Sequence, residues 1–509
     1  MAILDVLLNQ RGQILVGIAA VYLILKVLQY SKLRSFKGPW AAAISEIPQG
    51  IKTYTGQTHL WYREVSDKYG PIARIGPNSL ATSDPDVWIQ INTKPGYKRS
   101  DWYFKSVRIE YRRDHIFSET DTKRHDERKK QILPGYSGRE NLELESSVDD
   151  RVQEFLDLIR SKYLSTDERS VAMDLSKKIQ FLTLDIISTI GMGKNFGMLR
   201  ADTDINSYIK SSEEGLRVGN AFLACGLTWI AQAPVIGQLL SPNITDKSGY
   251  GAMIGAGYRA VDERLRDRND KRRDMLASFI RHGLAGDELR SEVVVQLVAG
   301  SDTTAGALRA ILLYIMATPR VVAKLQQEID EAIKSGKAPG NGAGIISLAA
   351  AKQLPYLQAV IREGLRVYPP VRNLLPKDIP PGGDTVMVDG KPVFLPGGAD
   401  IGLSALAMHR DKRLFGEDAE LFRPERWFES DPGKLAAMMK VSDLTFGHGR
   451  WACPGKTVAQ LELNKVIFEA FRYFDWAIAN PPSPWDIFNT FGIFVINNQW
   501  VQVTARPDA

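Results

Sequence analysis

The sequence contains very little cysteine: only Cys225 and Cys453 among 509 residues. Two cysteines cannot form a disulfide framework, and a reducing compartment is the simpler interpretation. A strong charge of one sign is also absent, because 65 basic and 59 acidic residues leave a net charge of +6. Over this length that excess does not indicate a nucleic-acid partner. Ordinary fractions of hydrophobic (44%) and charged (24%) residues exclude a disordered, fibrous or multi-span membrane protein.

Long apolar runs are equally scarce, and the one present lies near the N-terminus. Ile14–Leu25 is uninterrupted, and extending it past Lys26 to Tyr30 gives a segment that spans ~25 Å as a helix, enough for a thin bilayer. Basic residues are concentrated after the run, which predicts that the C-terminal part stays on the cytoplasmic side. These residues are Lys26, Lys32, Arg34 and Lys37, against Arg11 before the run.

Two alternatives compete with a membrane anchor: a cleaved signal peptide and an amphipathic helix lying in the membrane interface. A signal peptide needs a basic start and small residues at a cleavage site. Here Lys26 and bulky residues follow the run instead, so we favour a single signal anchor. Gly38 and Pro39 then mark a stiff joint. We therefore predict an anchor and hinge over residues 1–37 and one globular domain over residues 38–509.

The body predicts mainly helices with small β-sheets. Apolar spacing indicates helices, and proline or glycine marks their ends. A stretch rich in glycine, proline and valine predicts short strands with tight turns, whereas residues 411–451 follow no regular pattern. No linker divides the body, which favours a single large domain. The predicted helices are Val148–Lys162, Leu175–Ile190, Glu288–Thr318, Val321–Lys334, Leu354–Val367 and Thr457–Phe474, and the predicted strands lie in Ile379–Pro396.

Cys453 lies in a glycine-rich stretch, Phe446 to Gly455 (FGHGRWACPG), that carries the strongest chemical signal. A lone cysteine cannot complete a structural zinc site, but a lone thiolate can be the axial ligand of a haem iron. The glycines would let the backbone approach the porphyrin, and the helix starting near Thr457 would lower the thiol pKa. The alternative is a buried structural cysteine, which is the role we expect for Cys225.

This stretch resembles the haem-binding loop of cytochrome P450 monooxygenases, F-x-x-G-x-[RH]-x-C-x-G, through Phe446, Gly449, Cys453 and Gly455. Trp451 departs from it, because the family usually has Arg or His there, and Arg450 stands one place earlier. Three further family patterns follow the family's order, so with the anchor the resemblance covers essentially the whole chain. They are Ala299-Gly300-Ser301-Asp302-Thr303-Thr304, Glu363-x-x-Arg366, and Phe422-Arg423-Pro424-Glu425-Arg426-Trp427.

The resemblance implies a P450-like haem-thiolate fold with haem b bound through Cys453. It places Asp302 and Thr303 over the distal haem face, where a carboxylate can relay protons and a hydroxyl can hold a water. Gly300 would give room for O2 and a local break in helix hydrogen bonding. The alternative for Thr303 is a hydroxyl that bonds back to the preceding helical turn.

Other positions are expected to hold the propionates or to brace the loop. Relatives use His-x-x-x-Arg for propionates, which points to His125 and Lys129, with Arg128 adjacent; a basic face for a reductase is the alternative. Phe446, Gly449, Arg450 and Trp451 would complete the haem contacts, and Lys377 stands where relatives often have Arg. Glu363, Arg366 and Arg426 would form a buried network bracing the cysteine loop from the proximal side, without a catalytic role.

The leading hypothesis is a monooxygenase that inserts one oxygen atom from O2 into an apolar small molecule, with electrons from an NADPH-dependent flavoprotein reductase. Likeness to fungal pisatin-demethylase-type and benzoate-hydroxylase-type members suggests secondary metabolism. The anchor implies contact with lipid and a single pass through the endoplasmic reticulum membrane, with the catalytic domain in the cytosol. One alternative is a haem-thiolate isomerase or dehydratase that needs no reductase; the other is a non-catalytic haem protein that senses gas. Tyr103–Ile109 and Leu216–Leu240 are expected to form the entrance and roof of the substrate site.

Overall fold

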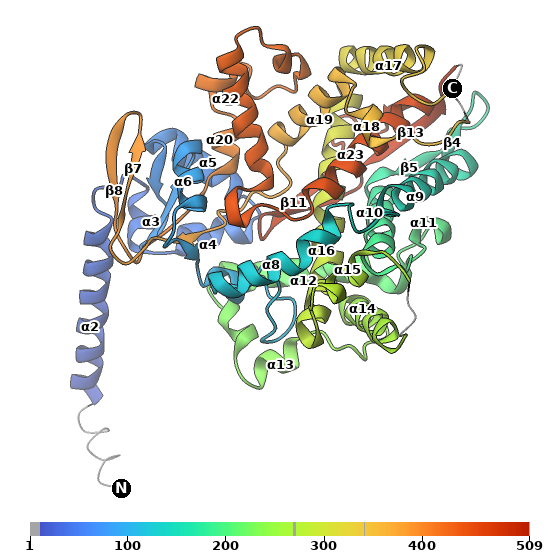
Figure 1. Cartoon of the computed structure of the whole chain (residues 1–509). Helices are drawn as coiled ribbons and strands as arrows, with labels where there is room; N and C mark the ends of the chain where they lie inside the picture. The colour runs from blue at the N-terminus through green and yellow to red at the C-terminus, as the bar shows by residue number, and fades with distance from the viewer. Residues whose placement is uncertain (1–10, 268–270, 341, 508–509) are drawn as a thin grey trace.

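The computed structural model describes residues 11–267, 271–340 and 342–507. Figure 1 shows a mainly helical body with small sheets at its edges, as predicted. The longer helices of the N-terminal half are α2 (Arg11–Lys32), α4 (Ile47–Tyr54), α5 (Thr58–Tyr69), α6 (Pro85–Thr93), α8 (Thr122–Tyr136), α9 (Leu144–Leu158), α10 (Leu175–Met192), α12 (Tyr208–Ala224) and α14 (Gly249–Arg266). Shorter ones are α3 (Trp40–Ile44), α7 (Trp102–Ser106), α11 (Met198–Ala201), α13 (Ile236–Leu240) and the 3-10 turn η3 (Thr228–Gln232).

The C-terminal half follows the predicted helices closely, with shifts of a few residues at their ends. The short helices α15, α18, α20 and α21 and the longer α22 were not predicted, and α21 and α22 lie within residues 411–451, for which the sequence shows no regular pattern. The helices are α15 (Met275–Arg281), α16 (Gly286–Met316), α17 (Pro319–Lys334), α18 (Leu348–Ala351), α19 (Pro355–Val367), α20 (Ala405–His409), α21 (Lys412–Phe415), α22 (Pro432–Asp443) and α23 (Lys456–Tyr473), with 3-10 turns η4 (Pro424–Phe428), η5 (Leu444–Phe446) and η6 (Gly449–Trp451).

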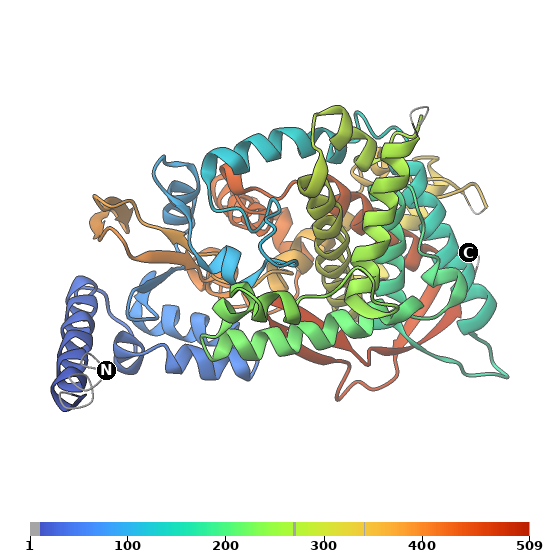
Figure 2. The same cartoon turned by 90° about the horizontal axis from the view of Figure 1, so that it is seen from below.

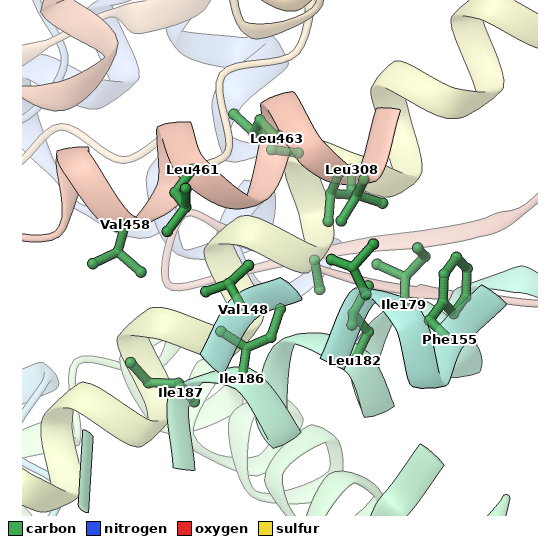
Figure 3. Packing of buried hydrophobic residues seen from close by; sticks show 14 of the residues in the cluster. Val148, Phe155, Ile179, Leu182, Ile186, Ile187, Leu308, Val458, Leu461 and Leu463 are labelled. Carbon is green, nitrogen blue, oxygen red and sulfur yellow. The ribbon is translucent and has the colours of Figure 1, made fainter. Parts of the chain in front are cut away.

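The main hydrophobic core lies where α16 passes between α9, α10 and α23 (Figure 3). Helix α10 is buried on nearly all sides, so its sequence is apolar around the whole helix and not along one stripe. Its start is capped by Asp174, whose side chain accepts a hydrogen bond from Ser176 N. Gly193, with φ of 68°, ends it in the left-handed conformation that favours glycine. The core thus holds the long α16 rigidly in the middle of the molecule.

The sheets are small and peripheral. A five-stranded sheet has the order β1-β2-β9-β6-β3, and a second joins β10, β13 and β4, with β5 also paired to β13. The predicted strands of Ile379–Pro396 are found as the antiparallel hairpin β7–β8, and β11–β12 forms another. The bounds are β1 Ile72–Arg74, β2 Ser79–Thr82, β3 Lys98–Arg99, β4 Leu164–Ser165, β5 Ala172–Asp174, β6 Lys377–Asp378, β7 Asp384–Val388, β8 Lys391–Leu395, β9 Asp400–Leu403, β10 Phe474–Ile478, β11 Asp486–Thr490, β12 Ile493–Asn497 and β13 Trp500–Ala505.

Helix α2 stands clear of the body in Figure 2 and joins it at its C-terminal end. There the buried Arg74 of β1 donates hydrogen bonds to Tyr30 O and Gln29 O, in the last turn of the helix. Among the described residues, no single helix is long and apolar enough to cross a bilayer, although α16 and α17, bent by 103°, reach that threshold as a pair by length and composition. Residues 1–10 of the predicted anchor lie outside the described residues.

Candidate functional site: the Cys453 loop and the buried cations beside it

The loop before α23 folds back on itself around Cys453, whose N–H donates to Phe446 O at 2.8 Å. Gly447 and Gly449 have φ of 73° and 60°, a region that side chains disfavour. A Cβ on Gly449 would also lie 2.7 Å from Asn92 O of α6. Both glycines are therefore required by the backbone. Phe446 itself is half-buried against the main core.

The environment of the Cys453 sulfur suits a metal ligand. Burial raises the pKa of the thiol, while N–H groups of Gly455 and Lys456 and the charge of Lys129 act in the opposite direction. These donors favour the thiolate without fully offsetting burial, so a bound cation would complete its stabilisation. Although the surrounding protein desolvates the thiol, the side chain still keeps accessible surface, which argues against a packing role. Cys225 is also exposed, at the end of α12, so the expectation that it is buried is wrong.

Two buried cations lie beside the loop, and one of them was not predicted. Arg99 of β3 lies over the Trp451 ring at 4.6 Å, and Lys377 Nζ of β6 is 5.5 Å from the same ring. Lys377 Nζ donates to Tyr103 Oη and Leu375 O, while Arg99 Nη1 donates to backbone carbonyls. Within the described residues neither cation has a carboxylate at ion-pair distance, and Arg99 Nε has no partner.

This pair of cations costs free energy unless an anion joins it. Burial lowers the pKa of Arg99 to about 10, and burial together with the Arg99 charge lowers the pKa of Lys377 well below its ordinary value. Two carboxylates beside these side chains would raise both pKa values again, and charge-assisted hydrogen bonds would hold the carboxylates in place. The residues present therefore fit a haem: Cys453 would supply its thiolate ligand, and Arg99 and Lys377 would pair with its carboxylates. Sequence could not identify Arg99, because only the pairing of β3 with β6 brings it beside Lys377.

The other predicted propionate residues are distributed differently. His125 packs on Trp451, with ring centroids 4.3 Å apart, so both belong to the same cluster. Lys129 Nζ donates to Arg450 O and Ala452 O and thereby braces the cysteine loop. Arg450 directs its side chain to Asp126, 3.8 Å away.

Arg128 is placed away from this cluster, which corrects its assignment. Its guanidinium donates to Asp114 O and to Glu288 Oε1, at 2.7 and 2.6 Å. It also lies 3.5 Å from the buried Glu292 of α16. Arg128 therefore ties α8 to α16, and the acids of α16 explain why its charge is turned from Trp451.

The predicted acid and alcohol lie next to each other on α16 and point to different partners. Asp302 Oδ1 accepts a hydrogen bond from Gln180 Nε2 of α10 at 2.6 Å, and burial raises the pKa of Asp302 to about 6. Thr303 Oγ1 donates to Ala299 O at 2.8 Å, the bond to the preceding turn that was the alternative interpretation. A role in proton delivery for either residue stays a prediction.

Gly300 has a packing reason to be glycine. A Cβ there would lie 2.7 Å from Ile187 Cγ1 of α10, so the crossing of α10 and α16 excludes a larger residue at this position. Its predicted role in making room for O2 stays a prediction.

The predicted network on α19 is confirmed in its contacts. Glu363 accepts two hydrogen bonds from Arg366, at 2.8 and 2.9 Å, and one from Arg426 at 2.8 Å; all three residues are buried. Arg366 also donates to His409 O and Ala419 O. The network therefore fastens α19 to the segment between α20 and η4, and does not bond the cysteine loop directly.

The roof segments predicted at Tyr103–Ile109 and Leu216–Leu240 meet one another. Arg108 donates to Gln232 of η3 at 3.1 Å and to Asp114 at 2.7 Å. Several side chains of η3, of α13 and of the residue before α13 are largely exposed: Trp229, Val235, Ile236, Leu239 and Leu240.

Comparison with known proteins agrees with this geometry. The family model described as "Cytochrome P450" matches residues 38–505. The chain is 38% identical over 506 residues to a protein named cytochrome P450 monooxygenase ABA1 from Pyricularia oryzae, covering 97% of this chain and 96% of that one. It is 36% identical to cytochrome P450 monooxygenase aba1 of Botryotinia fuckeliana, with 93% and 92% covered. A pisatin demethylase of Fusarium vanettenii is 29% identical, with 90% and 87% covered.

Proposed function

Because this chain belongs to the cytochrome P450 family, we propose that it is a haem-thiolate monooxygenase that inserts one oxygen atom from O2 into an apolar small molecule. The observation that supports this most is that the two buried cations Arg99 and Lys377 lie on the ring of Trp451, in the loop that carries Cys453. Haem b carries both a metal that can take a thiolate ligand and two carboxylates that pair with cations. When bound, it supplies the activation of O2.

The chain's own residues would hold this group in one orientation. Cys453 supplies the thiolate, and donors at Gly455 and Lys456 stabilise it. Arg99, Lys377 and the Trp451 ring surround the propionate end. Lys129 fixes the carbonyls of the loop, so that the sulfur stays in place.

Asp302 and Thr303 would supply protons on the distal side of the haem, opposite Cys453. Inserting one atom of O2 and reducing the other to water consumes two protons and two electrons. Asp302 is partly buried, and desolvation raises its pKa to about 6, so it can both take and give a proton close to neutral pH. Thr303 can turn its hydroxyl from Ala299 O toward a water on the distal side. The electrons would come from NADPH through a flavoprotein reductase.

Attachment to a membrane is part of the proposal. Side chains of α2 that are more than half exposed include Val16, Val21, Ile24, Val27 and Leu28. Trp40, Ile47 and Tyr54 on α3 and α4 are exposed as well. An exposed apolar surface of this extent is typical of contact with lipid or protein. We place the anchor in the endoplasmic reticulum membrane, with the catalytic domain in the cytosol.

The substrate class is inferred from the relatives. The relatives are fungal, and one of them is named a pisatin demethylase. Their names suggest oxidation of a secondary metabolite.

One experiment separates this function from the two alternatives. Full-length protein is reconstituted with a fungal reductase in vesicles and supplied with NADPH, labelled O2 and extracts of candidate metabolites. A monooxygenase gives product with one labelled oxygen per NADPH consumed. Product without NADPH use or label would instead indicate an isomerase or dehydratase. Absence of turnover despite ligand-dependent haem spectra would favour a sensor.

A further inference from the structure

A small pocket lined by both polar and apolar side chains includes Asp302. Four elements enclose it: α10, α12, α16 and β12. It is lined by Gln180, Ile209, Ser212, Glu213, Leu216, Asp302, Arg309, Ile493, Phe494 and Val495.

Three charged side chains share this pocket. Glu213 of α12 is partly buried and accepts a hydrogen bond from Asn497 Nδ2 at 3.1 Å. Arg309 of α16 is buried, and its Nε and Nη2 both donate to Ser176 O, a neutral carbonyl. The third is Asp302, held by Gln180. Two carboxyl groups therefore face one guanidinium, which forms a direct ion pair with neither of them.

The charge balance of such a pocket favours one retained proton. If both carboxyls were ionised, the pocket would carry a net negative charge in a poorly solvated place, and like charges raise each other's pKa. If both were protonated, the Arg309 charge would lack a counter-ion. The balanced state has one carboxylate and one carboxylic acid.

The pKa shifts of these three groups agree with this charge balance. Burial raises the pKa of Asp302 and of Glu213, and the Glu213 charge adds to the rise at Asp302, whereas Arg309 opposes it at both. Burial lowers the pKa of Arg309. The other charged groups that act on Glu213 are Arg217 of α12, which favours its ionisation, and Asp204, which opposes it. Asp174 of the β5–α10 junction acts on Arg309.

We propose that Glu213 and Asp302 share one proton across this pocket, and that Glu213 passes protons from the surface of α12 to Asp302. Glu213 releases its proton into the pocket, the Asp302 carboxylate receives it, and Glu213 is reprotonated from solvent, so the transfer moves no electrons. Glu213 is a positioning residue in this scheme, because it acts through Asp302. The proposal rests on the monooxygenase function and extends its proton path outward by one residue.

The test compares Glu213→Gln with the matched control Glu214→Gln in the full-length, haem-loaded protein. Both remove a glutamate from α12, but Glu214 is exposed and does not line the pocket. The first measurement is independent of turnover: difference infrared titration of the Asp302 carboxyl, identified by its loss in Asp302→Asn. We expect Glu213→Gln to lower the Asp302 pKa, because a neighbouring negative charge is removed. Glu214→Gln should leave it at the wild-type value.

The second measurement is the pH profile of product and hydrogen peroxide formed per NADPH. Glu213→Gln should reduce the rate by up to ~10²-fold, the lower end of what a positioned acid or base contributes, and should raise the share of peroxide. Glu213→Asp, which keeps the carboxyl, should recover much of the rate. A merely structural Glu213 would leave both the pH profile and the Asp302 pKa unmoved.

Failure of this proposal is distinguishable from failure of the function itself. Suppose Asp302→Asn slows turnover, while Glu213→Gln and Glu214→Gln give the same Asp302 pKa and the same pH profile of turnover. The proposal of a shared proton is then overturned, and the proposed function stands. If Asp302→Asn turns over like wild type, the proton role of α16 fails together with the scheme.

Discussion

Cys453 is the residue on which the proposed chemistry depends, because it alone offers a thiolate in a loop shaped by Gly447 and Gly449. The carbon monoxide complex of the reduced protein should show the red-shifted Soret band of a thiolate-ligated iron. Cys453→His should convert this spectrum to the imidazole type, while Cys225→Ser, which removes the other cysteine, should leave it unchanged. A Cys453→Ala protein with the wild-type spectrum would contradict the assignment.

Arg99 gives a prediction with two opposite signs. Arg99→Gln removes a charge-assisted contact to a propionate, worth ~1.5–3 kcal/mol, so haem should dissociate roughly 10–150-fold faster. The same change relieves the repulsion between Arg99 and Lys377, so the haem-free chain should become more stable. Haem transfer to a scavenging globin and urea unfolding of the haem-free protein measure the two effects. Lys98→Gln, on the same strand but exposed, is the control. Faster haem loss together with a less stable haem-free protein would indicate a purely structural Arg99.

For single residues, the sequence identified neighbours of Cys453 that belong to a recognisable pattern. It did not identify residues that only the folding of the chain brings close to Cys453. The family resemblance pointed to Trp451, His125 and Lys129; His125 packs on Trp451 and Lys129 bonds the loop, while their contact with propionates stays a prediction. Arg128 was misassigned because sequence adjacency to Lys129 does not reveal the carboxylates of α16 that attract it. Arg99 carries no local pattern at all, since its neighbours in space come from β6 and η6.

Among the helices, α19 contributes the contact that is most costly to break. Arg366→Lys keeps one charge but loses the planar fork that meets both oxygens of Glu363 and donates to carbonyls at residues 409 and 419. Leaving the buried Glu363 partly unpaired should lower the free energy of unfolding by about 3–5 kcal/mol. Arg362→Lys, on the same helix but partly exposed and paired with Asp443, should cost less than about 1 kcal/mol. Chemical denaturation measures both; equal losses would contradict a buried network.

Helix α16 also predicts a pH dependence of stability through Glu292. Burial raises the pKa of Glu292 to about 8, from an ordinary value near 4.5. Between these values the folded chain keeps a proton that the unfolded chain releases, so the free energy of unfolding falls as pH rises from about 5 to 8. Glu292→Gln should make that decline shallower, because Gln cannot ionise, and Glu64→Gln, at an exposed position of α5, is the control. A decline as steep as in wild type would show that Glu292 is ionised in the fold.

Element by element, long periodic segments were predicted well and short irregular ones were not. Helices α10, α16, α17, α19 and α23 follow their apolar spacing, since each buries a defined face or its whole surface in the core. Helix α22 escaped prediction because most of its residues are not buried, so its apolar pattern is weak. Its start is marked by Asp431, whose side chain caps it, and by Pro432, a signal that could have been used.

At the scale of the whole molecule, the joint between α2 and the body decides where an anchor can be cut. Leu33 is fully buried in a hydrophobic cluster separate from the main core, together with Leu80 and Ile401 of the five-stranded sheet, and Phe36 packs against this cluster. Lys37 O accepts a hydrogen bond from Arg74 N. Removing residues 1–27 should therefore spare these contacts, whereas removing residues 1–37 deletes the buried Leu33 side chain, a loss of the kind that costs about 2–5 kcal/mol.

The last prediction concerns which surfaces bind the membrane. Both truncated proteins should keep haem, because neither cut reaches the Cys453 loop or the cations beside it, and only the longer cut should lower the midpoint of urea unfolding. Vesicle flotation should show weaker binding than the full chain but not complete release, since Trp229 and Leu239 remain exposed on η3 and α13. Replacing both by Ser in the 1–27 deletion should weaken the remaining binding further, because each buried apolar side chain contributes roughly 1.5–3 kcal/mol, while the exposed Trp40, Ile47 and Tyr54 stay in place. Replacing the exposed Met387 and Phe394 of the β7–β8 hairpin is the control for any apolar surface. If the shorter deletion floats as strongly as the full chain, α2 contributes nothing to attachment; if it no longer floats at all, α2 alone attaches the protein and the roof faces solvent.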